Sequence, residues 1–519
     1  MSAWFGFDEA DVIALGLAVL LAAIFIARSL IVSLARRLAG RTLLCMAILA
    51  MLPILLRLAL LPHHPVPAPR VADDFSYLLL GDTLAHFRLA NPMHPMHRFF
   101  EGVFIVQDPS YSSIYPLGQG FALAFGQLVF GLPWAGVVLS AGLLCALCYW
   151  MLRGWTSPEW ALAGGLLAVT GFGPLSTWMN TYWGGAVSGI AGCLVFGALP
   201  RLKNSHRTKD AILLGAGLGL QLLTRPFEFV LLAGIVVLFF APVRSLVIAG
   251  LVLLPAIGLT LLQNRQVTGS WATLPYQLSR YQYGIPATFT FQPNPAPHRD
   301  LTVEQRIDYE AQVDAHNLAG QSYLAQLGRQ VRFYRFFLPA PLYLALPAFL
   351  FVVRQYRFAW VALALAVFWL GDAFYPFFYP HYIAAEASLL LLVAVVSLEK
   401  LAGWSAEAAT FVLALCLGHF AYWYGFNPGA LIDARPSGRL AVEERLNLEP
   451  GRQVIFVHYS TPRVSGEWVQ NAADIDSARI VWAVDRGPEE DSLLRHYYRD
   501  RRAWMVEPDA RPPKLTPME

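Results

Sequence analysis

Apolar segments long enough to cross a membrane recur along most of this 519-residue chain, and they constrain its fold more than any other feature. A helix needs about 20 predominantly apolar residues to cross the hydrocarbon core of a bilayer. Backbone polar groups inside lipid must find partners within the same segment, so these segments are predicted to be helices. The candidate spans are residues 12–34, 42–61, 134–152, 160–176, 184–199, 210–224, 227–241, 243–262, 334–353, 358–375, 381–398 and 405–425. The sequence therefore predicts a mostly α-helical, polytopic transmembrane bundle with about twelve spans.

Charged residues are scarce before residue 431 and dense after it. Only 14% of the chain is charged, whereas soluble domains carry about a quarter. The last 89 residues hold 28 of the 73 charged side chains. We therefore expect a transmembrane domain over 1–430 and a small soluble α/β domain over 431–519. In that domain, helices are predicted over 437–447 and 489–500, and strands of a partly parallel sheet over 453–459, 478–484 and 503–508.

Basic residues between the spans set the expected orientation. Short loops rich in Lys and Arg face the cytoplasm, and such loops follow the spans that end near residues 34, 199, 241 and 353. All of these loops share one face only if the apolar stretch 117–131 lies on the membrane surface as an interfacial helix. Both termini and two large loops, 62–133 and 263–332, are then expected on the outer face.

Two adjacent carboxylates, Asp73 and Asp74, lie in the first large outer loop. One member of such a pair can act as a general base while the other orients it or binds a cation. The alternative is helix capping, in which an acid stabilises the start of a helix. The same loop contains His and acidic residues that leave a divalent metal open, although their spacing matches no zinc signature. These residues are His86, His94, His97, Glu101 and Asp108.

Further polar candidates lie at the outer ends of predicted spans and in the second large loop. Asn180 stands near two glycines, which indicates close backbone approach to a ligand. Arg225 is placed to bind a phosphate, because a guanidinium binds phosphate through two parallel hydrogen bonds. Snorkelling or an ion pair with Glu228 is the alternative. Arg280 lies in an aromatic stretch that suits either a sugar or lipid-phosphate contact or simple loop packing.

His381, Tyr382 and Glu386 begin a late predicted span at its outer end. An acid inside a membrane span is a functional candidate by default. Pairing of Glu386 with His381 near the interface is the alternative.

At this point the chain resembles the C-type (GT-C fold) polytopic membrane glycosyltransferases, the superfamily of the protein O-mannosyltransferases and the lipid A aminoarabinose transferases. The resemblance rests on the Asp73-Asp74 pair, the Tyr115-Pro116 step before a surface helix, the many spans and the His381-Tyr382 pair, and it covers roughly residues 40–425. It implies a polyprenyl-phosphate-linked sugar as donor. It also implies inverting transfer to a hydroxyl of a glycan, lipid or protein acceptor. The implied location is a bacterial inner membrane, with both termini periplasmic.

Individual residues carry this resemblance unequally. Asp73 corresponds to the first acid of the family's pair and would act as the base, with Asp74 as the alternative. His381 and Tyr382 fall where relatives contact the donor phosphate. This sequence departs from the family because aspartate replaces the usual second-position glutamate, and because Tyr115 stands where relatives carry a charged residue before proline. The acceptor therefore stays open, no cofactor is assigned, and a divalent metal is neither required nor excluded.

Other functions share parts of this pattern. A surface-polysaccharide polymerase or ligase would use the same donor lipid, but it is expected to rely on Arg and His rather than on adjacent acids. A secondary transporter is typically built from two related halves with substrate groups near mid-membrane, and no such repeat is visible. A non-catalytic membrane scaffold has no need of Asp73 and Asp74 together. A net charge of +3 without a basic, aromatic-rich run excludes nucleic acid as a partner.

Overall fold

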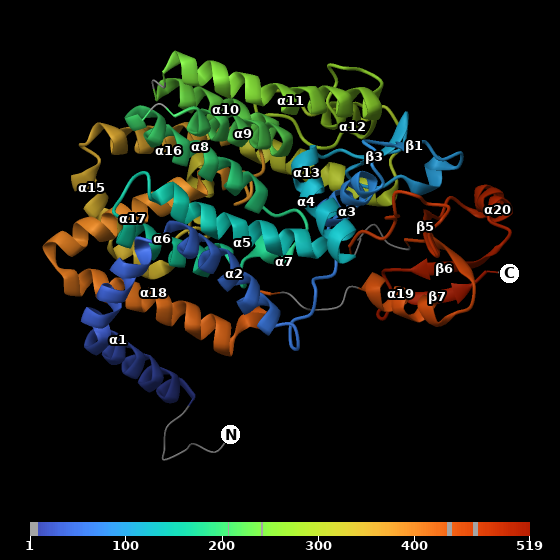
Figure 1. Ribbon diagram of the computed structural model, residues 1–519. Coiled ribbons are helices and arrows are strands. Elements are labelled where there is room, and N and C mark those ends of the chain that lie inside the picture. Colours follow the sequence, from blue (N-terminus) through green and yellow to red (C-terminus); the bar gives the residue numbers. More distant parts are fainter. Residues whose placement is uncertain (1–8, 206, 240–241, 433–437, 460–465, 519) are drawn as a thin grey trace.

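The computed structural model describes residues 9–205, 207–239, 242–432, 438–459 and 466–518. Long helices packed side by side form most of the molecule, and a small sheet flanked by helices lies at one end (Figure 1). The longer helices of the bundle are α1 (Glu9–Ala39), α2 (Thr42–Ala59), α5 (Pro133–Leu152), α6 (Pro158–Phe172), α8 (Ala186–Ser205), α9 (Thr208–Thr224), α10 (Pro226–Leu238), α11 (Val243–Thr268), α16 (Tyr356–Asp372), α17 (Ala387–Trp404) and α18 (Ala406–Phe426).

The bundle has the character of a membrane-embedded structure. Within the described residues, seven helices are long and apolar enough to cross a bilayer. Their outward faces are apolar, with Ile26 85% and Leu43 83% exposed. Such a surface suits lipid rather than water. Eleven of the predicted spans coincide with helices, and the predicted polytopic helical bundle is confirmed. The last two positions of the predicted span 227–241 and the first position of the predicted helix 437–447 lie outside the described residues.

The prediction of one continuous helix over 334–353 is wrong. It is divided into short pieces, η2 (Ala340–Leu344), η3 (Leu346–Ala348) and α15 (Phe349–Val352). Pro339, Pro341 and Pro347 explain the division. A proline inside a helix removes a backbone hydrogen bond and collides with the preceding turn.

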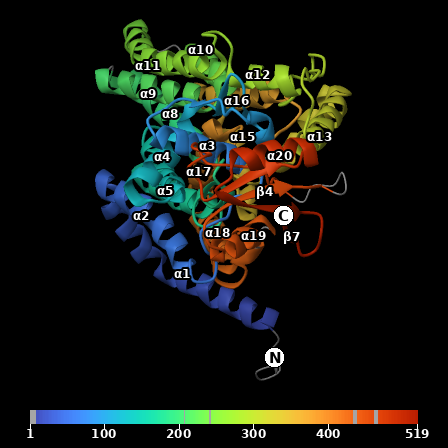
Figure 2. The same cartoon turned by 90° about the vertical axis from the view of Figure 1, so that its right-hand side faces the viewer.

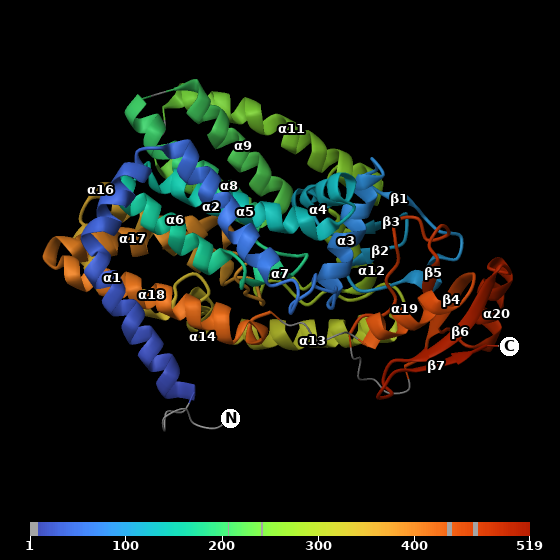
Figure 3. The ribbon, with the colours of Figure 1, turned by 60° about the horizontal axis from the view of Figure 1, so that its bottom comes forward.

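Both large predicted loops are folded. The first contains α3 (Ala72–Ala85), β1 (Asn91–Pro92), η1 (His97–Phe100), β2 (Ile105–Val106), β3 (Ser110–Ser113) and α4 (Leu117–Phe130), with the strands in antiparallel order β1-β3-β2. The second contains α12 (Pro275–Tyr283), α13 (Val303–Gly320) and α14 (Tyr323–Tyr334), and α13 and α14 lie along one edge of the molecule in Figure 3. Helix α4 packs on α3 and α5. Its predicted interfacial position stays a prediction.

A buried arginine fixes the chain between the bundle and α3. Arg57 of α2 is fully buried, and its Nε donates to Asn180 Oδ1 at 2.7 Å. Asn180 ends the short helix α7 (Thr177–Asn180). The other guanidinium nitrogens donate to the carbonyls of His64 and Pro65 at 2.9 and 3.0 Å. These bonds pin the segment that leads into α3.

The C-terminal elements form one small sheet with helices, which we call the C-terminal unit. It consists of α19 (Gly438–Leu448), β4 (Arg452–Val457), β5 (Ile480–Val484), α20 (Pro488–Tyr497), β6 (Arg501–Glu507) and β7 (Lys514–Pro517). The strand order is β5-β4-β6-β7; β4 is parallel to β5 and β6, and β7 is antiparallel to β6. The partly parallel sheet agrees with the sequence prediction, but β7 was not predicted. The domain boundary at residue 431 stays a prediction, because residues 433–437 lie outside the described residues.

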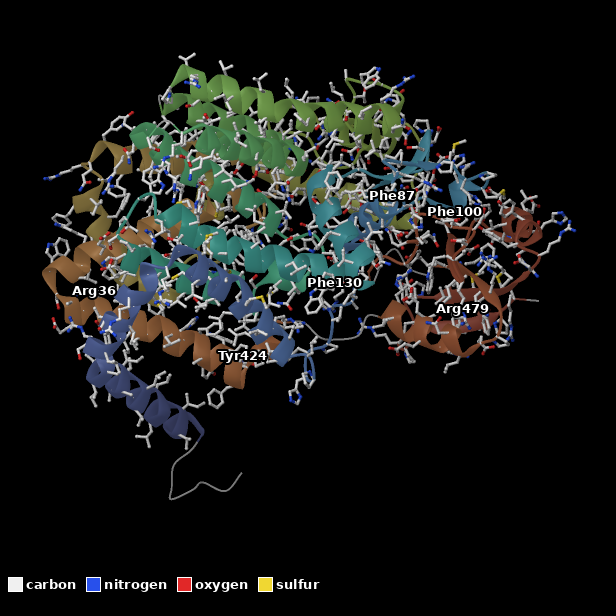
Figure 4. All side chains as sticks on the ribbon, in the orientation of Figure 1. Arg36, Phe87, Phe100, Phe130, Tyr424 and Arg479 are labelled. Atoms are coloured by element: carbon white, nitrogen blue, oxygen red, sulfur yellow. The ribbon has the colours of Figure 1, made fainter. Side chains whose placement is uncertain are left out.

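The C-terminal unit and the basic end of α1 lie at opposite ends of the molecule. In Figure 4, Arg36 labels one end, while Phe100 and Arg479 label the other. Turning the molecule by 90° places the unit in front of the bundle, next to the region of α3 (Figure 2).

Candidate active site

The acid pair lies in the first turn of α3, and its two members have different environments. Asp74 is 4% exposed, and it accepts hydrogen bonds from the backbone amides of Tyr182 at 3.0 Å and Arg70 at 3.1 Å. Burial raises the pKa of Asp74 to about 6, although these amide bonds act against the rise. Asp74 therefore holds the start of α3 against the segment after α7. This role differs from helix capping, because the N-cap residue of α3 is Val71, which makes no side-chain cap hydrogen bond.

Asp73 is bound by a side chain instead of by backbone amides from other segments. The hydroxyl of Tyr115 donates a hydrogen bond to Asp73 Oδ1. Burial raises the pKa of Asp73, while the Tyr115 bond and the positive charge of Arg225 counteract that rise. Tyr115 is itself fixed, because its ring stacks on Tyr77 with a centroid distance of 4.1 Å and its carbonyl accepts from Gln263 Nε2 at 2.8 Å. Burial and the negative charge of Asp73 raise the pKa of Tyr115 well above 10, so this phenol stays a donor.

Arg225 is the cation whose positive charge acts on the carboxylate of Asp73. It lies between α9 and α10, largely buried, with its guanidinium 4.4 Å from the ring centre of Tyr382. Its Nη1 forms an ion pair with Oε1 of Glu228 at 3.9 Å, which is the alternative that the sequence left open. Among the described residues, the guanidinium donates no hydrogen bond. Its hydrogen-bonding groups are therefore available to an anion.

His381 and Tyr382 complete an aromatic wall beside Arg225. His381 is 5% exposed, and its ring meets those of Trp183 at 4.3 Å and Tyr382 at 4.6 Å. Tyr379 stacks on His381 with a centroid distance of 5.6 Å. Burial, followed by the positive charge of Arg225, lowers the pKa of His381 well below 6.5. The imidazole is therefore neutral at pH 7 and can act as a hydrogen-bonding group rather than as a cation.

Arg280 reaches the same region from α12. Its Nε donates to the carbonyl of Pro286 at 3.0 Å, and one terminal nitrogen donates to the carbonyl of Ala287 at 2.9 Å. Burial lowers its pKa, while Tyr375 and Tyr276 raise it. Tyr276 also meets the ring of Tyr115 at 5.7 Å. Arg280 is thus held at the edge of the site with its second terminal nitrogen unbonded among the described residues.

Asn180 is the predicted site residue that lies apart from this cluster in its contacts. Its Oδ1 accepts from Arg57, and its Nδ2 donates to the carbonyls of Pro174 and Ser176 at 2.9 and 2.8 Å. All of its hydrogen-bonding groups serve the fold. The two glycines nearby provide room for Trp178 rather than for a ligand, since a Cβ on Gly185 would lie 2.5 Å from the Trp178 ring.

A cavity of about 670 Å³ opens beside the aromatic wall. Its lining combines arginines from α14 and the turn after it with aromatic rings, and Tyr379 belongs to both cavity and site. Burial raises the pKa of Tyr379, the negative charge of Asp73 adds to the rise, and the positive charge of Arg332 opposes it. The lining includes Arg329, Arg332, Arg335, Gln330, Phe333, Phe336, Phe377, Phe378 and Tyr379. Gln330 is fully buried, and neither polar atom of its side chain has a partner among the described residues.

The structure gives no metal site from the His-rich loop. Among the residues that the structure describes, no group of three His, Cys, Asp or Glu side chains could hold a metal ion. Asp108 pairs with Arg299, and His94 contacts Asp476 at 3.1 Å. These side chains are occupied in holding the outer loops to each other and to the C-terminal unit.

Sequence reasoning missed several residues at the site. Tyr77, Tyr276 and Tyr375 surround Asp73, Arg225 and Arg280, and each has an electrostatic interaction with Arg225. Asp308 and Glu467 interact with Asp73 from distant parts of the chain. Tyr77 could have been found, because it lies one helical turn after Asp73. The others carry no local signal.

Comparison with known proteins shows which solved structures share this fold. No protein-family model and no curated protein matches the sequence. Two crystal structures share its fold: ArnT from Cupriavidus metallidurans in the apo state, with a TM-score of 0.51, and the same enzyme bound to undecaprenyl phosphate, with a TM-score of 0.50. In both comparisons the sequence identity is 11%, and the match covers 90% of this chain and 93% of ArnT. The chain therefore has the GT-C-like polytopic helical fold of ArnT.

Proposed function

We propose that the protein is a membrane glycosyltransferase that moves a sugar from a polyprenyl-phosphate donor to an acceptor hydroxyl. The observation that carries the proposal is the convergence of Asp73, held by Tyr115, with the largely buried and available guanidinium of Arg225. A base and a cation within electrostatic reach of each other suit a reaction in which a proton leaves one group while negative charge develops on a phosphate. The ArnT structure with undecaprenyl phosphate supports a lipid phosphate as the ligand.

In the proposed reaction, the acceptor oxygen bonds to the anomeric carbon as the bond from that carbon to the phosphate oxygen breaks. The acceptor proton moves to the carboxylate of Asp73, and the electron pair of the broken bond stays on the phosphate. A single displacement inverts the anomeric configuration. Tyr115 holds Asp73 in place, while Arg225 and the unbonded nitrogen of Arg280 stabilise the leaving phosphate. Neutral His381 and Tyr382 provide a hydrogen-bonding wall for the same group.

The cavity beside Tyr379 is the proposed route of the donor. A lipid-anchored donor arrives from the bilayer, so its headgroup needs a passage with cationic groups and its chain needs apolar walls. The cavity lining supplies both, with Arg332 among its cationic groups and Phe333 and Phe378 among its apolar ones. Transfer is proposed to occur at the outer face of a bacterial inner membrane, with both termini on that side.

The test is release of polyprenyl phosphate by purified protein in nanodiscs. The donors are undecaprenyl-phosphate-linked sugars with different sugar groups, and a crude cell-envelope extract supplies the acceptor. We expect release by the wild-type protein and a loss of at least about a hundredfold in Asp73→Asn, while Asp73→Asn still binds undecaprenyl phosphate. Equal release by both proteins would remove Asp73 from the mechanism. Passage of a donor or solute across sealed vesicles without bond cleavage would support a transporter instead, and transfer of a long glycan would support a polymer ligase.

A further inference from the structure

The C-terminal unit is fastened along the helix that carries Asp73. The backbone amide of Ala473 donates to Asp82 Oδ2 at 2.7 Å, near the end of α3. The guanidinium of Arg439 lies 4.9 Å from the ring centre of Phe75, near the start of the same helix. The side-by-side position of the unit and α3 is visible in Figures 1 and 2. The unit is thus part of the wall around the candidate site.

One side chain of the unit reaches the site itself. Glu467 accepts a hydrogen bond from the backbone amide of Ala72, the residue that precedes Asp73. Burial raises its pKa well above 4.5, and the negative charges of Glu304, Asp308 and Asp73 add to that rise. Its Oε2 is buried and has no hydrogen-bond partner among the described residues. A buried carboxylate oxygen without a partner is costly unless a ligand satisfies it.

A second acid, Asp308 of α13, interacts electrostatically with Glu467 and with Asp73. Asp308 accepts from Gln312 Nε2 at 2.6 Å. Burial raises its pKa to about 7, and the charge of Asp73 contributes to the rise. Glu304 is partly committed elsewhere, because its Oε1 accepts from the hydroxyl of Tyr459 and from the amide of Trp468 at 2.9 Å, while its Oε2 is buried without a partner among the described residues. Of the acids whose charges act on Asp73, Glu467 has the oxygen without a partner, and Asp308 lies beside it in electrostatic interaction.

Charges of both signs act on Asp73. Arg225 is a cation that suits a phosphate, whereas Asp308 and Glu467 are acids that suit hydrogen-bond donors. A sugar phosphate presents both kinds of group, an anionic phosphate and, a few atoms away, several hydroxyls. The two kinds of charge match the chemistry of such a ligand.

We propose that Glu467, with Asp308, is a specificity-determining residue that accepts hydrogen bonds from hydroxyl groups of the transferred sugar, so that the C-terminal unit completes the site. This inference rests on the proposed function for the identity of the ligand. It assigns the unit a direct part in substrate recognition. Carboxylates that bond substrate hydroxyls also discriminate strongly against ligands that lack them.

The test compares two ligands that differ only in the sugar. Affinity for undecaprenyl phosphate and for its glucose-, galactose- and mannose-linked forms is measured in nanodiscs, without acceptor and therefore without turnover. We expect the wild-type protein to bind at least one sugar-linked form more tightly than undecaprenyl phosphate. Glu467→Gln is expected to weaken binding of that form about tenfold or more, while binding of undecaprenyl phosphate changes less than about twofold.

Two further variants keep the result interpretable. Glu489→Gln changes an exposed acid on α20 of the same unit and is expected to leave both affinities unchanged. Asp308→Asn lies outside the unit and is expected to reproduce the selective loss, even if Glu467→Gln destabilises the C-terminal unit. Equal weakening for both ligands, or none for either, would overturn the proposal. So would a wild-type protein that binds every sugar-linked form no better than undecaprenyl phosphate. None of these outcomes depends on whether Asp73 is the catalytic base.

Discussion

Replacement of Tyr115 by phenylalanine tests how the environment of Asp73 sets its protonation. Phenylalanine keeps the ring that stacks on Tyr77 and meets Tyr276, and it removes only the hydroxyl that donates to Asp73. That hydrogen bond favours the ionised carboxylate, so its loss raises the pKa of Asp73 further. A base must be ionised to accept a proton, so activity falls as the pH falls through the pKa of Asp73. The acid limb of the pH profile is therefore expected to move to higher pH in Tyr115→Phe.

The size of the shift follows from the energy of the bond. A hydrogen bond to a charged group contributes about 1.5–3 kcal/mol, and one pKa unit corresponds to about 1.4 kcal/mol. Arg225 remains in the variant and still favours the carboxylate. We expect a shift of about one to two pH units. Below the limb this corresponds to a loss of about ten- to a hundredfold in kcat/KM, while the plateau at higher pH changes much less.

The assay is release of polyprenyl phosphate as a function of pH, for the wild-type protein and for Tyr115→Phe. Tyr111→Phe is the matched control, because Tyr111 is also buried in β3 but donates to the carbonyl of Asn471 rather than to Asp73. Its acid limb is expected to coincide with that of the wild-type protein. An unmoved limb in Tyr115→Phe, or an equal shift in both variants, would refute the reasoning.

Four further substitutions separate ligand binding from folding. Arg225→Gln is expected to weaken binding of undecaprenyl phosphate about tenfold or more, measured by titration in nanodiscs, because it removes the available cation of the site. Arg332→Gln is expected to raise KM for the donor with little change in kcat, because its side chain lines the entry cavity rather than the site. Asn180→Ala is expected to cost about 1–3 kcal/mol of stability, seen as a lower unfolding midpoint, because it removes a partner of buried Arg57. Arg439→Ala is expected to loosen the C-terminal unit, seen as faster proteolysis there, because its guanidinium donates to the carbonyls of Trp468 and Gln470.

Much of the bundle was predictable because its elements are set by local composition. Spans such as α2, α5 and α18 follow from long apolar runs alone, since a bilayer requires that length. The parallel core of the C-terminal sheet followed from alternating strands and helices. The broken segment after Arg335 was missed because an average over apolar residues ignores three closely spaced prolines. Strand β7 was missed because Lys514–Pro517 is short and polar, and its pairing with β6 depends on tertiary context.

The candidate site was predictable where residues act through chemistry that is visible in sequence. Asp73, Arg225, His381 and Tyr382 were expected on the outer side of the membrane, and the structure brings them together. The sequence left open which acid of the pair faces the site, because both positions lie in one helical turn. Backbone amides decide it, since two of them bind Asp74.

Contributions from far along the chain were beyond local reasoning. Glu467 lies in a segment that reads as an ordinary loop, nearly 400 residues after Asp73. Only the docking of the C-terminal unit on α3 places it at the site. Asn180 illustrates the reverse case, because a polar residue between aromatics and glycines had the signature of a ligand contact but serves Arg57.

The most direct test of the account is a crossed comparison of Asp73→Asn and Asp74→Asn, with release of polyprenyl phosphate and the unfolding midpoint measured for each protein. Asp73 is assigned to proton transfer and Asp74 to holding the start of α3. Asp73→Asn is therefore expected to abolish release with a midpoint close to that of the wild-type protein. Asp74→Asn is expected to lower the midpoint and to retain measurable release at a temperature where it is folded. Retained release in Asp73→Asn together with complete loss in a folded Asp74→Asn would contradict the account and transfer the role of base to Asp74.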